Sequence, residues 1–104
     1  MIRIEVAPEA REDLKRIWRY LANEASLDIA DRVREKVLAT FETLARDPGI
    51  GHKREDLTSL KVNFYSVYQL MVIYSYEPET LRILGVIHGK RDVATLLAER
   101  FAEK

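Results

Sequence analysis

Residues 67–92 read VYQLMVIYSYEPETLRILGVIHGKRD and carry the clearest fold signal in the chain. They contain two apolar runs, 67–76 and 81–87, separated by Glu77-Pro78-Glu79-Thr80. Both runs are rich in β-branched and aromatic residues and are too short for well-capped helices, so each is predicted to be a strand. The polar residues between them predict a hairpin. Because the first run is apolar on both faces, we expect it to lie in the middle of a sheet.

A polar cluster, His88-Gly89-Lys90-Arg91-Asp92, follows the second strand directly and is the first candidate for a functional site. One interpretation is a rim histidine whose ring covers the junction with the next helix. The other is a general acid or base for phosphodiester cleavage, with Arg91 stabilising the charged transition state. The role of Arg91 and Asp92 is open in the same way, because an Arg–Asp pair at a strand–helix junction can also be purely structural and hold the loop in place.

Two amphipathic helices are predicted upstream. Pro8 begins the first, which runs to about residue 25, and Ser26 is expected to cap the second, which Asp47-Pro48-Gly49 ends. Their apolar stripes consist of Ala10, Leu14, Ile17, Trp18 and Leu21 in the first helix, and of Ala30, Val33, Val37, Leu38, Phe41 and Leu44 in the second. Helices joined by so few residues form an antiparallel hairpin, and we expect the stripes to cover the sheet.

The remaining segments complete one domain. Strict alternation at residues 2–6 predicts a short strand, residues 61–65 predict another, and the helical spacing of Val93, Leu96, Leu97 and Phe101 predicts a C-terminal helix. The predicted fold class is α+β, with the order β-α-α-β-β-β-α and a helical hairpin packed on a small antiparallel sheet. We expect residues 1–104 to form a single domain.

The composition bears on several classes of function. The chain has no cysteine and only two histidines, His52 and His88, so we expect no disulfide, no metal site and no cofactor. Seventeen basic residues balance seventeen acidic ones, which argues against strong direct binding of nucleic acid. No apolar run approaches the roughly 20 residues that span a bilayer, so we expect a cytoplasmic protein without a membrane contact.

Three sequence features extend over essentially the whole chain. They are Ala10-x-x-Asp13-Leu14-x-x-Ile17-x-x-Tyr20, Leu44 followed by Asp47-Pro48-Gly49, and Tyr68-x-x-x-Val72-x-Tyr74 leading to Ile83-Leu84-Gly85-Val86-Ile87-His88-Gly89-Lys90-Arg91-Asp92. The third, an apolar strand ending in His-Gly-x-Arg-Asp, is the most specific. Together they resemble the ParE branch of the RelE/ParE superfamily of bacterial type II toxins. The resemblance implies a helical hairpin packed on an antiparallel sheet, in agreement with the fold predicted from the residues.

Members of this superfamily are similar in fold and differ in target. ParE-like toxins are associated with inhibition of DNA gyrase and with plasmid stabilisation, whereas RelE-like toxins cleave messenger RNA on the ribosome. Both are neutralised by an antitoxin encoded beside them. The resemblance therefore implies a toxin that forms a hetero-oligomer with a cognate antitoxin. An interaction module of the same fold without a toxic target is a further alternative.

The two toxic activities imply different site residues. A messenger RNA endonuclease would use Lys61, Arg82, His88 and Arg91 around the scissile phosphate. A gyrase inhibitor would have no catalytic residues and would bind its target through His88, Lys90, Arg91 and Asp92. RelE-like enzymes are typically strongly basic and often place a C-terminal tyrosine or histidine at the scissile phosphate, whereas this chain is neutral and has no tyrosine after Tyr76. These features favour a gyrase inhibitor that is not an enzyme.

Overall fold

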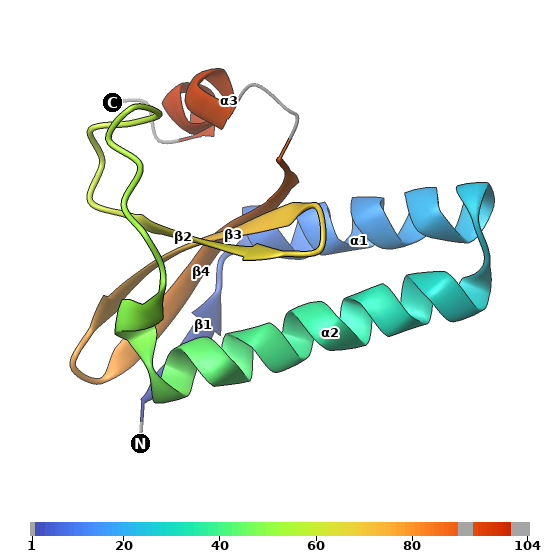
Figure 1. Cartoon of the computed structure of the whole chain (residues 1–104), viewed down its shortest axis with the longest axis horizontal. Helices are drawn as coiled ribbons and strands as arrows, with labels where there is room; N and C mark the ends of the chain where they lie inside the picture. Colours follow the sequence, from blue (N-terminus) through green and yellow to red (C-terminus); the bar gives the residue numbers. More distant parts are fainter. Residues whose placement is uncertain (1, 90–92, 101–104) are drawn as a thin grey trace.

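A four-stranded sheet forms the centre of the computed structural model, which describes residues 2–89 and 93–100. Its strands are β1 (Arg3–Val6), β2 (Asn63–Val67), β3 (Leu70–Glu77) and β4 (Thr80–His88), in the spatial order β1-β4-β3-β2 (Figure 1). The α+β class and the predicted order of elements are confirmed. The β2-β3-β4 meander is antiparallel as predicted, but the sheet as a whole is mixed because β1 pairs in parallel with β4.

Helices α1 (Pro8–Glu24) and α2 (Leu27–Arg46) form the predicted hairpin and cover one face of the sheet (Figure 1). Pro8 lies in the first turn of α1, where its missing N–H is no loss. The Ser26 hydroxyl accepts a hydrogen bond from the Ile29 N–H at 3.1 Å and so caps α2. The core between hairpin and sheet is formed by Ala10, Val37, Phe41, Leu44, Val67, Leu70, Val72, Tyr74, Leu81, Ile83 and Val86.

Some residues of the predicted stripes belong neither to this core nor to the apolar side chains packed against it, namely Trp18, Leu21, Ala30 and Leu38. Leu38 is exposed on α2. The Trp18 ring is half-buried against α2, where its Nε1 donates a hydrogen bond to Asp31 Oδ1 at 2.8 Å and the Arg34 guanidinium lies 5.8 Å from the ring centroid. Helical spacing alone does not distinguish Trp18 and Leu38 from the stripe residues that face the sheet.

The opposite face of the sheet has a second, smaller core. Helix α3 (Val93–Arg100) covers it, as the C-terminal helical pattern predicts (Figure 1). The buried residues here are Val62, Phe64, Ile73, Ile87, Val93 and Leu97. The central strands are therefore buried on both faces, which explains why they read as nearly continuous apolar runs.

The boundary between β2 and β3 differs from the prediction. The apolar run 67–76 is not one strand, because Val67 ends β2 and Leu70 begins β3 after a turn at Tyr68 and Gln69. Tyr68 has a φ of 56°, in the left-handed region where bulky residues are uncommon. The turn carries no Gly, Asn or Pro, so the usual signal for a hairpin was absent.

Tyr74 ties the segment after α2 to the sheet. Its side chain is fully buried, and its hydroxyl donates to the Pro48 carbonyl oxygen at 2.7 Å and accepts from the Gly51 N–H at 3.0 Å. Pro48 begins a short 3-10 helix, η1 (Pro48–Ile50), and Gly51 follows it. Burial raises the pKa of Tyr74 above its ordinary value of 10.0.

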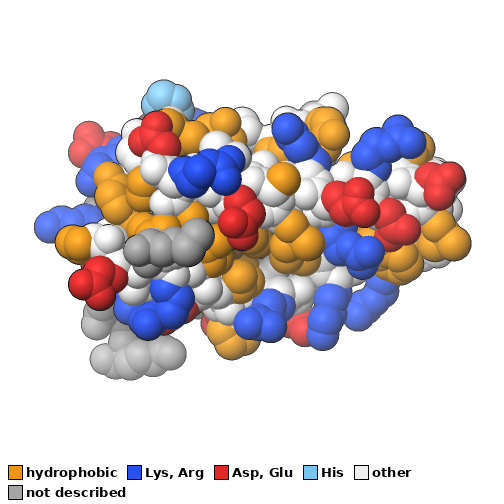
Figure 2. Space-filling view, turned by 90° about the horizontal axis from the view of Figure 1, so that it is seen from below, with side chains coloured by type: hydrophobic (Ala, Val, Ile, Leu, Met, Phe, Trp, Pro, Cys, Tyr) orange, Lys and Arg blue, Asp and Glu red, His pale blue; other side chains and the backbone are white. Residues whose placement is uncertain are grey.

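Charged side chains of both signs are interspersed on one face of the molecule (Figure 2). Figure 2 shows this on the face seen from below, along which α2 lies. Exposed ion pairs such as Arg34–Asp31 at 3.2 Å and Lys15–Glu12 at 3.3 Å are worth at most about 1 kcal/mol each. In the described part of the chain, no helix is both long and apolar enough to cross a membrane.

Candidate functional site

The helical hairpin extends past the end of the sheet, as Figure 1 shows, and a groove of about 700 Å³ lies between the two. It is lined by Asp13, Arg16, Ile17, Tyr20 and Leu21 of α1, Val33 of α2, the turn residues Tyr68 and Gln69, and Leu70, Val86, Ile87 and His88 of the sheet. Most of this surface is apolar. Tyr20 and Tyr68, which are 64% and 61% exposed, place large aromatic rings at the surface of the groove.

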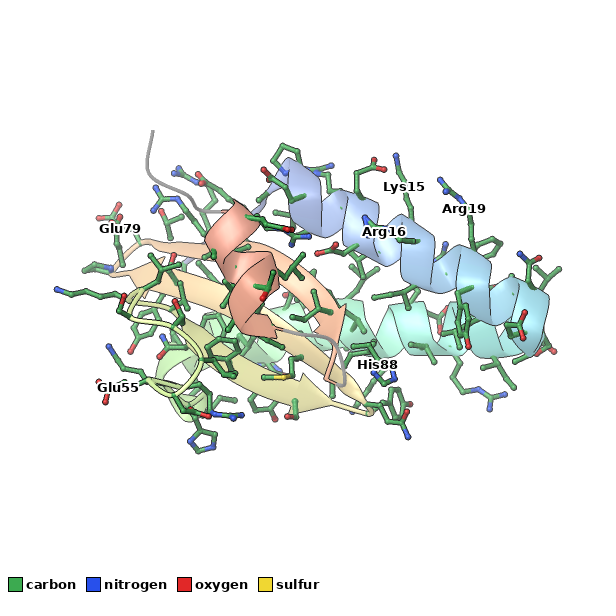
Figure 3. All side chains as sticks on the ribbon, turned by 90° about the horizontal axis from the view of Figure 1, so that it is seen from above. Lys15, Arg16, Arg19, Glu55, Glu79 and His88 are labelled. Atoms are coloured by element: carbon green, nitrogen blue, oxygen red, sulfur yellow. The ribbon has the colours of Figure 1, made fainter. Side chains whose placement is uncertain are left out.

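Two basic side chains border the apolar lining from opposite elements. Figure 3 shows Arg16 on α1 and His88 at the end of β4, whereas Lys15 and Arg19 point away from the sheet. Arg16 is largely exposed and lies 3.7 Å from Asp13, while His88 is half-buried. The groove therefore offers apolar contact area with positive charge at its border, an arrangement suited to an amphipathic segment that carries carboxylates.

The sequence prediction identified one residue of this groove. His88 is the last residue of β4 and pairs with Leu70, and the next N–H, that of Gly89, donates to the Gln69 carbonyl oxygen at 2.9 Å. The other predicted target-binding residues, Lys90, Arg91 and Asp92, lie outside the described residues.

Lys61 and Arg82 do not converge on His88. Arg82 lies six positions before His88 on β4, roughly 20 Å along the strand. The pairing of β3 with β4 shifts by one residue between Ile73 and Tyr74, so Arg82 and His88 face opposite sides of the sheet. Its guanidinium pairs with Glu5 at 3.2 Å and Glu77 at 3.7 Å. Lys61 is exposed and precedes β2, at the end of that strand remote from His88. The structure thus does not bring the predicted nuclease residues Lys61, Arg82 and His88 together.

A buried ion pair beside the groove was not predicted. Asp13 is only 2% exposed, and both of its oxygens accept hydrogen bonds from Arg100 of α3, at 2.8 and 3.0 Å. Asp13 Oδ2 also accepts from the Val86 N–H at 3.0 Å. These hydrogen bonds to Asp13 raise the pKa of Arg100. The Asp13–Arg100 clasp, as we name this pair, links α1, β4 and α3.

The clasp lies beside the part of β4 that no longer pairs with β1. β1 pairs with β4 only as far as Ile83, so the Val86 N–H meets a carboxylate instead of a strand. Arg100 Nη1 also lies 3.5 Å from the Leu84 carbonyl oxygen. Gly85 leaves space for the pair, because a Cβ atom there would lie 2.7 Å from Arg100 Nη1.

One sequence signal pointed to the clasp. Asp13 lies on the same helical face as Ala10 and Ile17, so a carboxylate occupies a core position of the first stripe. A buried carboxylate needs a cation and hydrogen-bond donors. Helical spacing alone does not reveal that these come from β4 and α3. Among the described residues, no group of three or more His, Asp or Glu side chains is placed to hold a metal ion.

Comparisons with known proteins agree with this architecture. Residues 4–93 match the family described as ParE toxin of type II toxin-antitoxin system, parDE. The chain is 29% identical over 87 residues to Toxin RelE3 of Caulobacter vibrioides, covering 83% of this chain and 92% of that protein. Its fold is similar to that of a chain in the chromosomal ParDE TA system from P. aeruginosa, with a TM-score of 0.72 and 13% identity, covering 85% of this chain and 96% of that chain.

The fold and the match over most of the chain define a toxin of a type II toxin–antitoxin system. The chain belongs to the ParE toxin family, within the RelE/ParE group that the sequence features resemble. Membership of this family implies an antitoxin partner.

Proposed function

We propose that this toxin inhibits DNA gyrase by binding it, and that a cognate antitoxin neutralises the toxin by occupying the groove. We favour gyrase over messenger RNA as the target because the predicted nuclease residues lie apart in the structure. A phosphodiesterase places its acid, its base and its charge-stabilising cations around a single phosphate. Here Arg82 lies on the other face of the sheet from His88 and is already paired with two glutamates.

Charge supports the same choice. A ribosome-bound nuclease works among dense phosphates and gains affinity by releasing their counterions, which requires an excess of basic residues. This chain has seventeen of each sign, and on the face that Figure 2 shows they are interspersed. A protein target requires only a complementary patch, for which overall neutrality is no disadvantage.

Purified toxin should inhibit supercoiling by gyrase or trap its cleaved complex. Arg91→Ala should raise the concentration for half-inhibition by roughly 30-fold, as expected for an interface arginine worth about 2 kcal/mol, and His88→Ala by less than about threefold. Arg91→Ala should have the larger effect because an arginine can anchor a protein contact. His88→Ala should have the smaller effect because inhibition by binding requires no proton transfer. Arg32→Ala, at an exposed position of α2, is the control. Undiminished supercoiling at toxin concentrations that arrest growth would contradict the proposal.

The protein encoded beside the toxin gene should bind with nanomolar-range affinity and a large negative heat-capacity change, as expected for a segment that folds on binding. An amphipathic helix in the groove is the favoured arrangement, and a strand added at the sheet edge is the alternative. Tyr20→Ala, at the groove border, should weaken binding by roughly 10- to 30-fold. Leu38→Ala removes a similarly exposed apolar side chain outside the groove lining and should have little effect. Equal losses in calorimetry would place the antitoxin elsewhere.

A further inference from the structure

Asp13 lies between two arginines that reach it from different parts of the fold. Arg100 of α3 binds both of its oxygens, at 2.8 and 3.0 Å. Arg16, one turn further along α1, lies 3.7 Å from Asp13 Oδ1, too far for a good hydrogen bond, and lines the groove. Its side chain is 57% exposed, compared with 11% for Arg100. One carboxylate therefore has a principal cation in the protein interior and a second within reach on the groove side.

The presence of Arg16 lowers the free-energy cost of separating Arg100 from Asp13. A buried carboxylate that loses its only partner is strongly destabilised. Arg16 has a flexible, exposed side chain on the same helix, so a small rotation would bring it into contact with Asp13. Separation of α3 from Asp13 then leaves a paired charge instead of an isolated one. The cost of opening the clasp is correspondingly reduced.

We propose that Arg16 and Arg100 compete for Asp13, so that Arg100 acts as a positioning residue that keeps Arg16 available to a carboxylate of the partner in the groove. This inference rests on the proposed antitoxin site for its partner, but the competition itself is a property of the chain alone. When α3 is docked, as in this structure, Arg100 satisfies Asp13, and Arg16 lies 3.7 Å from Asp13 without a good hydrogen bond and can turn to the groove. When α3 leaves, Arg16 turns to Asp13 and the groove loses its nearest arginine.

The coupling has a defined sign and is reciprocal. A partner carboxylate that pairs with Arg16 withdraws the substitute cation from Asp13, and Asp13 then depends on Arg100 alone. Binding of an acidic segment in the groove should therefore hold α3 more firmly on the opposite face. By the same argument, loss of Arg100 should weaken the binding of that segment although Arg100 does not line the groove.

A double-mutant cycle without any partner tests the competition. Arg16→Gln alone should change the unfolding constant by less than about threefold, and Arg100→Gln alone should raise it by roughly 30-fold. The double variant should exceed the product of these effects by more than about tenfold, because Asp13 then has neither cation. Hydrogen exchange at the amides of α3 should follow the same order. An additive cycle would overturn the proposal.

Calorimetry with the protein encoded beside the toxin gene tests the coupling. Arg100→Gln should weaken its binding by roughly five- to tenfold in the wild-type background and by less than about twofold in an Arg16→Gln background. Arg100→Lys, which retains a cation for Asp13, should restore part of the affinity. An equal loss in both backgrounds would mean that Arg100 supports the fold only. Absence of binding to the wild type would contradict the proposed antitoxin, whereas an additive cycle would contradict the competition for Asp13.

Discussion

Asp13→Ala is expected to lower the free energy of unfolding by about 3–5 kcal/mol, a large part of the stability of a domain of this size. The substitution removes the acceptor of three hydrogen bonds, leaves the Arg100 guanidinium in a mostly buried position without its carboxylate, and leaves the Val86 N–H without its acceptor. Arg16 cannot compensate, because it carries the same charge as Arg100. Urea denaturation followed by circular dichroism gives the difference directly.

The control for this prediction lies one residue away. Glu12→Ala removes a carboxylate of the same helix that is exposed and, among the residues that the structure describes, pairs with Lys15, so its effect should stay within about 0.5 kcal/mol. Asp13→Asn separates the two roles of the side chain, since the amide oxygen can still accept from Val86 but carries no charge for Arg100. It should fall between Asp13→Ala and the wild type. If Asp13→Ala cost no more than Glu12→Ala, the clasp would not hold the three elements together.

Gly51→Ala is expected to cost about 2–4 kcal/mol, because the new methyl group would overpack a rigid site and break a buried hydrogen bond. A Cβ atom at Gly51 would overlap the Tyr74 hydroxyl and would lie 2.9 Å from both Tyr74 Cε1 and the Phe64 carbonyl oxygen. The ring is fully buried and the Phe64 oxygen belongs to the backbone, so neither can move away easily. Thermal unfolding measures the loss.

Gly49 provides a matched comparison within the same short segment. Among the described residues, a Cβ atom there would meet the Tyr76 hydroxyl at 3.9 Å, an ordinary van der Waals contact. Gly49→Ala should therefore be neutral, or stabilising by up to about 1 kcal/mol through the smaller entropy of the unfolded chain. Equal destabilisation by the two substitutions would indicate that the segment needs glycine flexibility, and that the space around Tyr74 is not the cause.

Local patterns were sufficient for most of the fold. The β-branched runs gave the β3–β4 hairpin, and the two apolar stripes with Ser26 and Asp47-Pro48-Gly49 gave the helical hairpin. The parallel pairing of β1 with β4 could not be inferred, because the alternation of Ile2, Ile4 and Val6 shows only which side chains face inward. The turn at Tyr68 was missed because a tyrosine adopts a left-handed conformation that favours glycine or asparagine.

The candidate site was less accessible to such reasoning. His88 was singled out because a polar cluster follows an apolar strand, and the structure places it in the lining of the groove. The groove itself depends on the length of the helical hairpin relative to the sheet, and the clasp depends on Arg100, which lies 87 residues from Asp13 in the chain. Arg82 and Lys61 were grouped with His88 because of their residue types. The register shift between β3 and β4 turns Arg82 to the other face of the sheet, and strand direction places Lys61 at the remote end of β2.

The choice between gyrase and messenger RNA is tested most directly by mapping the 5′ ends of messages on translating ribosomes after the toxin is added. Gyrase supercoiling is assayed with the same preparation. We predict intact messages and inhibited supercoiling, because Lys61, Arg82 and His88 do not surround a common phosphate in the structure. Codon-specific cuts that disappear in His88→Ala, with supercoiling unaffected, would contradict this and make the protein a ribosome-dependent endonuclease.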